Sequence, residues 1–552
     1  MAFTNNKVNP NDPPVSASRE YEKKAIGSGS TYFSTERVGQ LATENEIRDL
    51  LHVVDHVPTE AWLAALIGAA ERFAWYGCTG PLQNYLQRSP TDDIPGALGL
   101  SQATASAIVS ALLAVSYFTP IPAAIWADGW MGRYKTLVIF YTLTLAGVII
   151  LFATSLPAVL KHVTSGWGVY TAMVLMSFGS GGVKAAITPF IADQYVNRDP
   201  IVRALKSGQL AVTDRELTIR YIYNTFYWMV NIGGLGSLGT TFLERYVGFW
   251  TAYLVPLIVM GVGTVPLFLW RRRFVKEPPV GTVLPQAVQA MALAAKGGFK
   301  MDSAKPKEQS EKHGKEVPWD IKFVDDLKSG LYTCRIFLLF PIHWLCLNQT
   351  FHNLISQAGT MEGYGVPNDA IKSFNPISII IITPVVNLLL YPFLTRRNIN
   401  FSPIMRITVG FAILTISLAI ATGVQKAIYS AGPCYNHPLA CTASDDGRIP
   451  NRVPMFVQLP IYLTGGIAEI FCYTTGLEYS YNQAPKSMRS IVQSYWLAMD
   501  GIGALLSIAF TPLAKDPHFV VMYGSIAGLM ATTTIIFALA FRRSNKMAME
   551  ML

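Results

Sequence analysis

The chain has 552 residues, of which 51% are hydrophobic and only 14% are charged. Soluble domains carry about 25% charged residues, so this composition excludes an ordinary soluble enzyme and indicates an integral membrane protein. The net charge of +9 does not indicate nucleic acid as a partner, because the cations gather in short loops and no base-reading motif stands beside them.

The first polar stretch, residues 1–59, contains no short apolar core of the kind found in signal peptides. Its composition predicts a disordered cytoplasmic segment, and the first apolar segment must then act as the insertion signal.

Twelve apolar segments follow, most of them near the roughly 20 residues that a membrane-spanning helix needs. They are 61–85, 101–126, 135–156, 168–190, 219–241, 249–270, 333–356, 374–395, 403–425, 453–480, 490–513 and 518–541. Basic residues follow the even-numbered segments, which places both termini in the cytoplasm by the positive-inside rule. These are Arg133 and Lys135, Arg271–Arg273, Arg396–Arg397 and Arg542–Arg543.

A charged stretch of about sixty residues separates the sixth and seventh segments. The sequence therefore predicts an all-α membrane protein with two six-helix bundles, at 60–270 and 333–542. A cytoplasmic linker joins them at 271–332, and a short tail covers 543–552. Transporters built from two such halves bind substrate near the membrane midplane, between the halves.

The first span carries Glu71 and Arg72 near its middle, with Tyr76 on an adjoining part of the same helical face. Charges at that depth are expensive and tend to face a bundle interior or a water-filled cavity. The face is interpreted as the wall of a polar pathway. The alternative is a buried ion pair that only locks two helices together.

Further polar groups interrupt the N-terminal half. Asp128 and Arg133 share one tight turn and are candidates for a cytoplasmic gate, the alternative being a plain basic loop. Lys184 lies among small residues of the fourth span and requires a partner, for which Glu71 is proposed; a structural lock is again the alternative.

In the fifth span, Tyr227 and Asn231 recur at four-residue spacing and project a phenol and an amide from one helical face. Such groups can bind a polar ligand without a permanent charge.

The tenth span holds Glu469 and Glu478, which are nine residues apart and half a turn out of phase on a straight helix. Glu469 is predicted to face the cavity, and Glu478 to be a structural partner of a cation or backbone donor. Trp496 in the eleventh span is a candidate cavity residue, with core packing as the alternative. Cys434 and Cys441 share an outer loop, where a disulfide is expected.

Taken together, these motifs resemble the proton-dependent oligopeptide transporter family of the major facilitator superfamily, and most closely its fungal branch. The segments that carry the resemblance stand in order along residues 60–540: ERFAWYG (71–77), the ADGWMG turn (127–132), GGVK…PFIADQ (181–194), FYWMVNIGG (226–234) and TGLEYSYNQAPKSMRS (475–490).

The resemblance implies uptake of di- and tripeptides driven by the proton gradient, with no cofactor, no metal and no enzymatic activity. By matching position, Glu469 would receive the peptide's amino terminus, and Lys184 and Asn231 would lie near its carboxylate. Asn375 would contribute to the cavity from the eighth span. Glu71 and Arg72 would couple protonation to gate movement together with Lys184. The protein would be a multi-pass, monomeric protein of the plasma membrane.

The chain departs from the family pattern at two places. Gly68 and Trp75 stand where relatives carry a leading glutamate and a tyrosine, and Asn348, beside Gln349, stands where several relatives have an acid. An amide cannot bind and release a proton near neutral pH. His343 is a candidate substitute, although a hydrogen-bonded structural role is the simpler interpretation.

Two alternatives of function remain open at this point. The first is a transporter of the same fold that moves another small organic or peptide-like solute with altered proton coupling. The second is a sensor that binds peptide without moving it. A membrane enzyme is disfavoured because the sequence contains no phosphate-binding loop, HExxH or GxSxG motif.

Overall fold

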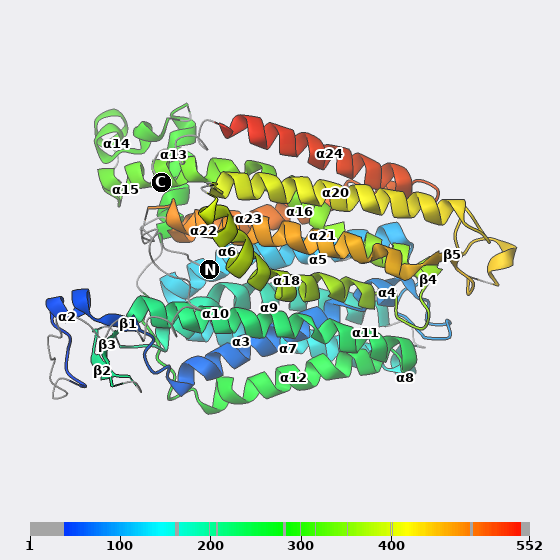
Figure 1. Cartoon of the computed structure of the whole chain (residues 1–552), viewed down its shortest axis with the longest axis horizontal. Coiled ribbons are helices and arrows are strands. Elements are labelled where there is room, and N and C mark those ends of the chain that lie inside the picture. Colours follow the sequence, from blue (N-terminus) through cyan, green and yellow to red (C-terminus); the bar gives the residue numbers. More distant parts are fainter. Residues whose placement is uncertain are drawn as a thin grey trace.

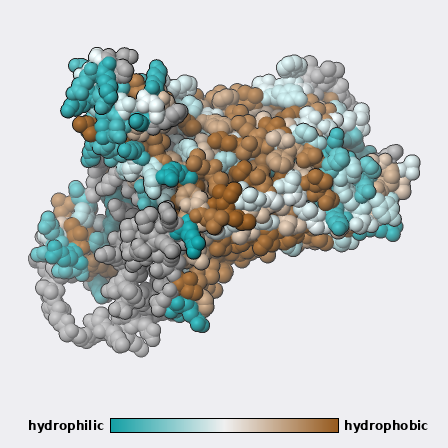
Figure 2. Space-filling view, turned by 90° about the horizontal axis from the view of Figure 1, so that it is seen from above, coloured by the Kyte–Doolittle hydropathy of each residue, from teal (hydrophilic) through white to brown (hydrophobic). Residues whose placement is uncertain are grey.

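A computed structural model describes most of the chain; residues 1–37 of the predicted N-terminal segment 1–59, and the predicted tail 543–552, lie outside the described residues. The described ranges are 38–160, 165–197, 199–205, 208–279, 283–298, 300–314, 316–349, 352–397, 399, 401–445, 447–485 and 489–542. The helices run along the long axis of the molecule (Figure 1). Hydrophobic side chains cover the middle of the visible face and hydrophilic ones gather at its two ends (Figure 2). This distribution is that of a protein embedded in a bilayer.

The helices of the N-terminal half follow in chain order. They are α3 (Thr59–Thr79), α4 (Leu82–Gln87), α5 (Gln102–Phe118), α6 (Pro120–Trp126), η3 (Ala127–Met131), α7 (Arg133–Ser155), α8 (Pro157–Leu160), α9 (Ser165–Asp193), α10 (Arg215–Gly234), α11 (Gly236–Tyr246) and α12 (Phe249–Leu269).

The stretch between the halves is helical and packs on itself. It contains α13 (Val283–Lys296), η4 (Met301–Ala304), α14 (Pro306–His313) and α15 (Ile321–Cys334). A small apolar core around Trp319 joins α13, η4 and α15.

The C-terminal half continues with alternating long helices and short irregular turns. Its elements are η5 (Arg335–Leu339), α16 (Phe340–Asn348), α17 (Asn353–Gly359), β4 (Met361–Glu362), η7 (Ala370–Ser373), α18 (Phe374–Val385), η8 (Val386–Leu390), α19 (Tyr391–Arg396), α20 (Pro403–Ser430), η9 (Thr442–Ser444), β5 (Asn451–Pro454), η10 (Met455–Gln458), α21 (Leu459–Glu469), η11 (Ile470–Thr474), α22 (Thr475–Asn482), α23 (Arg489–Ile508), η13 (Thr511–Leu513) and α24 (Phe519–Ala540).

Each of the twelve predicted spans coincides with one of these helices or with a run of adjoining helices. Within the described ranges, eight helical segments are long and apolar enough to cross a membrane, judged by length and composition alone. The spans that fall short are α3, α10 and α23, which carry many polar residues, and α18, which a π-helical turn interrupts. Polar spanning helices are stable where they face a bundle interior.

Two large apolar cores hold the helices together. One is built mainly by α3, α5, α7, α9 and α12, and the other mainly by α16, α20, α21, α23 and α24. In Figure 1 the first group lies in the lower part of the molecule and the second mostly in the upper part.

The prediction that residues 1–59 are disordered is wrong for the part that the structure describes. Helix α2 (Glu44–Asp49) begins with a capping box on Thr43, and β1 (Leu51–Val53) pairs in parallel with β3 (Leu210–Thr213). Strand β3 also pairs antiparallel with β2 (Val202–Ala204). Strands β2 and β3 come from the loop between the fourth and fifth spans. The N-terminal segment supplies β1, which hydrogen-bonds to the backbone groups at the edge of β3.

This small sheet and helices α13–α15 lie at one end of the molecule, and β4 and β5 lie at the other (Figure 1). The sheet and the linker mark the predicted cytoplasmic end. The end with β4 and β5 is called the outer end below.

Candidate functional site

Glu71 and Arg72 form a two-pronged ion pair inside the N-terminal half. Arg72 Nε donates to Glu71 Oε2 at 2.7 Å, and Arg72 Nη2 donates to Glu71 Oε1 at 2.7 Å. Arg72 Nη2 also donates to Ser180 Oγ on α9 at 2.6 Å. Paired charged hydrogen bonds of this kind fix geometry strongly. The pair therefore fastens α3 to α9, in agreement with the helix-locking interpretation.

Lys184 does not form the predicted ion pair with Glu71. Its Nζ donates to Ser116 Oγ at 2.7 Å and lies 3.7 Å from the ring centroid of Tyr117 and 5.5 Å from that of Trp75. The prediction is wrong because the adjacent guanidinium of Arg72 already binds both oxygens of Glu71. The ammonium instead rests on aromatic faces, an arrangement that stabilises a cation without a counter-ion.

Glu469 provides a carboxylate in the C-terminal half. It is the last residue of α21, and the π-helical turn η11 follows it directly. Asn375 Nδ2 donates to Glu469 Oε2 at 3.0 Å, so the eighth and tenth spans meet at this carboxylate. Glu478 lies on the other side of the turn and pairs with Arg406 at 3.4 Å, which confirms the prediction of a structural cation partner.

Tyrosines lie between the charged groups of the two halves. Tyr76 is within electrostatic range of Arg72 in its own half and of Glu469 and Asp500 in the other. Tyr227 is also within range of Glu469. The amide of Asn231 donates to the backbone carbonyl of Tyr227 at 2.8 Å.

Six of these groups are only partly buried. They are Tyr76, Lys184, Tyr227, Asn231, Asn375 and Glu469. Partial accessibility leaves these polar groups available to a ligand that enters between the halves. Together they combine one cation, one carboxylate and neutral hydrogen-bonding groups, which suits a small zwitterion.

The sequence reasoning missed Asp500 on α23, whose exposed fraction is 3%. Asn348 Nδ2 donates to Asp500 Oδ1 at 3.3 Å, and the carboxyl interacts electrostatically with Lys184 across the two halves. The signal was present, because a carboxylate within WLAMDGIG is as conspicuous in an apolar helix as Glu71 is in its own. Asn348 is not an acid itself, but its amide is hydrogen-bonded to one on a neighbouring helix.

His343 and Trp496 belong to the aromatic core of the C-terminal half. His343 is fully buried and stacks on Phe411 with ring centroids 5.4 Å apart, and its ring nitrogens have no hydrogen-bond partner within the described residues. Neither predicted role, proton carrier or hydrogen-bonded structural residue, matches this position. Trp496 is buried against Phe340 at 4.6 Å, so the alternative of core packing is correct.

The position of Gly68 has no room for a side chain. A Cβ placed there would lie 2.7 Å from Ile187 Cγ1 and 2.7 Å from Phe226 Cε2. Ile187 and the Phe226 ring therefore fill the space beside Gly68.

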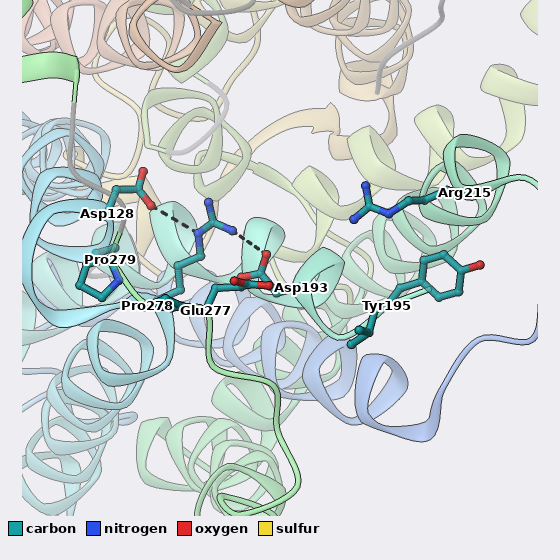
Figure 3. Close-up of a pocket in the computed structure, with 10 residues that line it drawn as sticks. Asp128, Asp193, Tyr195, Arg215, Glu277, Pro278 and Pro279 are labelled. Atoms are coloured by element: carbon teal, nitrogen blue, oxygen red, sulfur yellow. Dashed lines mark hydrogen bonds and ion pairs between the residues drawn. The ribbon is translucent and has the colours of Figure 1, made fainter. Parts of the chain in front are cut away.

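Asp128 and Arg133 meet at a cavity of about 330 Å³ at the predicted cytoplasmic end (Figure 3). Arg133 Nε lies 3.3 Å from Asp128 Oδ1, and Arg133 Nη1 lies 2.6 Å from Asp193 Oδ1 on α9. Glu277, at the start of the linker, also lines this cavity. These contacts remain within the N-terminal half and the linker, so they hold that half together and do not join it to the other.

The two halves are closed against each other at the outer end. Hydrogen bonds between the halves gather there, for example from Ser106 to Asn353 at 3.0 Å and from Gln87 to Ser356 at 3.0 Å. Cys434 and Cys441 are joined by a disulfide in the loop at this end. Within the described part of the chain, no group of acidic, histidine or cysteine residues is arranged to hold a metal ion.

Comparisons with known proteins decide the family. The model of the POT family matches residues 134–535. The chain belongs to the POT family. It is 37% identical over 507 residues to "Peptide transporter PTR_A" of Candidozyma auris, a match that covers 92% of this chain and 85% of that protein.

One further relative agrees with this assignment, and a solved structure shares the fold. "Peptide transporter PTR2" of Saccharomyces cerevisiae is 34% identical over 92% of this chain and 83% of its own length. The crystal structure of the POT family transporter PepTSo has a TM-score of 0.71 at 22% identity, and the match covers 89% of this chain and 99% of that chain. That structure supports the major facilitator fold of this multi-pass membrane protein.

Proposed function

We propose that this POT family protein takes up di- and tripeptides together with protons by alternating access. It would act as a monomer in the plasma membrane, with both termini in the cytoplasm. Curated fungal relatives carry the name peptide transporter, which supports the substrate class. The observation that carries the proposal is the placement of Glu469 and Lys184, one in each half and both only partly buried.

The two charged groups suit the two ends of a short peptide. The carboxylate of Glu469 would receive the amino terminus, and Lys184 and Asn231 would receive the carboxylate. Tyr76 and Tyr227 would hydrogen-bond the peptide backbone. A chain of two or three residues spans roughly 7 to 11 Å when extended, so the separation of the two poles would set the length of the peptide.

Proton coupling would act through competition between Asp500 and the peptide carboxylate for Lys184. The ionised carboxylate of Asp500 attracts the Lys184 ammonium from the opposite half. A proton on Asp500 removes that attraction and leaves Lys184 available for the peptide carboxylate. Peptide and proton would then bind together, which is the condition for symport. Glu71 and Arg72 would keep α3 and α9 aligned so that Lys184 remains in position.

An uptake assay in proteoliposomes tests the proposal. With an inward proton gradient, the protein should accumulate a labelled dipeptide, and a protonophore should abolish the accumulation. Glu469→Gln should abolish uptake, whereas Glu478→Gln, a matched change on the same span, should retain it apart from any loss of folded protein. Failure to accumulate any member of a di- and tripeptide panel would refute the substrate class.

A further inference from the structure

Two buried acids meet at the closed outer end, one from each half. Glu244 on α11 has an exposed fraction of 1%, and Asp369, directly before η7, has an exposed fraction of 0%. Their carboxyl groups lie within hydrogen-bonding range of each other. This contact is distinct from the internal polar residues described above, because it forms part of the seal between the halves.

The oxygen atoms of this pair are incompletely satisfied when both acids are ionised. Glu244 Oε1 accepts a hydrogen bond from Asn84 Nδ2 at 3.1 Å. Glu244 Oε2 and both oxygens of Asp369 have no partner within the described residues. An ionised carboxylate is an acceptor only, so two of them at this range repel each other and cannot hydrogen-bond. One proton between them supplies the missing donor and removes the repulsion.

The neighbouring cations do not neutralise the pair by direct contact. Lys372 Nζ donates to the carbonyl oxygens of Thr79 and Gly80 at 3.3 Å and 3.2 Å, and it forms no ion pair with either acid among the described residues. Arg88 acts on both acids only at longer range. The titratable or charged groups that face the two acids from the surrounding elements are Arg88, Lys372, Tyr253 and Tyr462.

We propose that a single proton shared between Glu244 and Asp369 latches the outer end of the transporter shut. Opening separates the halves, hydrates both carboxyl groups and releases the proton to the outside. Closure requires a proton to be captured from the outside. An acidic exterior therefore favours the closed outer end, and the proton that the latch takes up on closure is held at a site separate from Asp500.

This inference rests on alternating access, as in the proposed function, but its test needs no peptide. Spin labels at Asp93→Cys and Arg448→Cys report the opening directly, because those side chains form an exposed ion pair across the closed outer end with Arg448 Nη2 3.2 Å from Asp93 Oδ2. The four free cysteines are buried and do not compete for the label.

In the otherwise unchanged protein, the ratio of open to closed molecules should rise by up to tenfold per pH unit as the external pH is raised, because one proton is released on opening. Glu244→Gln and Asp369→Asn each introduce an amide donor that needs no added proton. Both variants should stay closed across the same pH range. Glu362→Gln, a matched change of another acid near the outer end, should keep the original pH dependence.

The proposal is overturned if the label distance does not change with pH, or if both amide variants keep the original pH slope. If a variant fails to fold, the absence of a pH response in the protein with an unchanged acid pair still overturns the proposal. A protein that opens and closes with pH but accumulates no peptide would refute the proposed function and leave the latch intact, so the two failures are distinguishable.

Discussion

Packing at Gly68 determines whether the glutamate of the family pattern can be restored there. A Cβ at this position lies 2.7 Å from Ile187 Cγ1 and 2.7 Å and 2.9 Å from two atoms of the Phe226 ring. Both neighbours are buried side chains that have little room to move. Overpacking of a close-packed interior costs about 1–3 kcal/mol, which is the expected destabilisation for Gly68→Ala. Gly68→Glu should cost more, since its carboxylate would be buried without a free cation beside it.

Thermal unfolding of the purified protein in detergent measures this effect. Gly261→Ala is the matched control, because Gly261 lies within α12 and a Cβ there meets no atom within 4 Å. Alanine is favoured over glycine inside a helix by about 0.5–1 kcal/mol, so this control should be neutral or slightly stabilising.

A second variant tests whether Phe226 is the side chain that obstructs position 68. Phe226→Ala leaves space for a side chain at position 68, so the combined Gly68→Glu and Phe226→Ala protein should lose less stability than the sum of the single changes. A coupling of about 0.5–3 kcal/mol is expected for residues in contact. The reasoning is refuted if Gly68→Ala unfolds at the same temperature as Gly261→Ala, or if the two single effects add without coupling.

Three further predictions concern other charged groups. Glu71→Gln should destabilise the folded protein by about 3–5 kcal/mol, because it leaves the Arg72 charge buried without its partner; unchanged thermal stability would argue against a structural pair. Asp500→Asn should abolish peptide accumulation driven by a pH gradient while peptide exchange at equal pH continues, and gradient-driven accumulation at the original rate would contradict the proton role. The protonated His52 ring donates from Nδ1 to the Asp214 carboxylate and from Nε2 to the Ile47 carbonyl, and these two hydrogen bonds raise the pKa of His52 above its ordinary 6.5. Docking of β1 should therefore be strongest below pH 6.5 and weaken as the pH rises through the raised pKa, seen as faster amide exchange at 51–53 after correction for intrinsic rates.

The apolar spans and their order could be predicted from the sequence because a bilayer fixes both the length and the hydrophobicity of a spanning helix. Local spacing along one helix was also informative. It separated Glu469 from Glu478, and the structure places them with different partners, Asn375 and Arg406.

Contacts between distant segments could not be predicted in the same way. The pairing of β1 with β3 joins residues about 160 positions apart, and no local pattern in either strand specifies the other. The partner of Glu71 was misassigned because adjacent residues on a helix diverge, yet the long side chain of Arg72 folds back to reach it. The contact of Glu244 with Asp369 depends on how the two halves meet, which the sequence of either half does not encode.

The central claim is that Glu469 and Lys184 hold the two ends of one peptide, and competition by end-blocked dipeptides tests it most directly. Uptake of a labelled dipeptide into proteoliposomes is measured against an unlabelled dipeptide, its N-acetylated form and its C-amidated form. We expect the free dipeptide to compete well and both blocked forms to compete poorly, because each has lost the charge that one pole binds. Equal competition by all three forms would contradict the account.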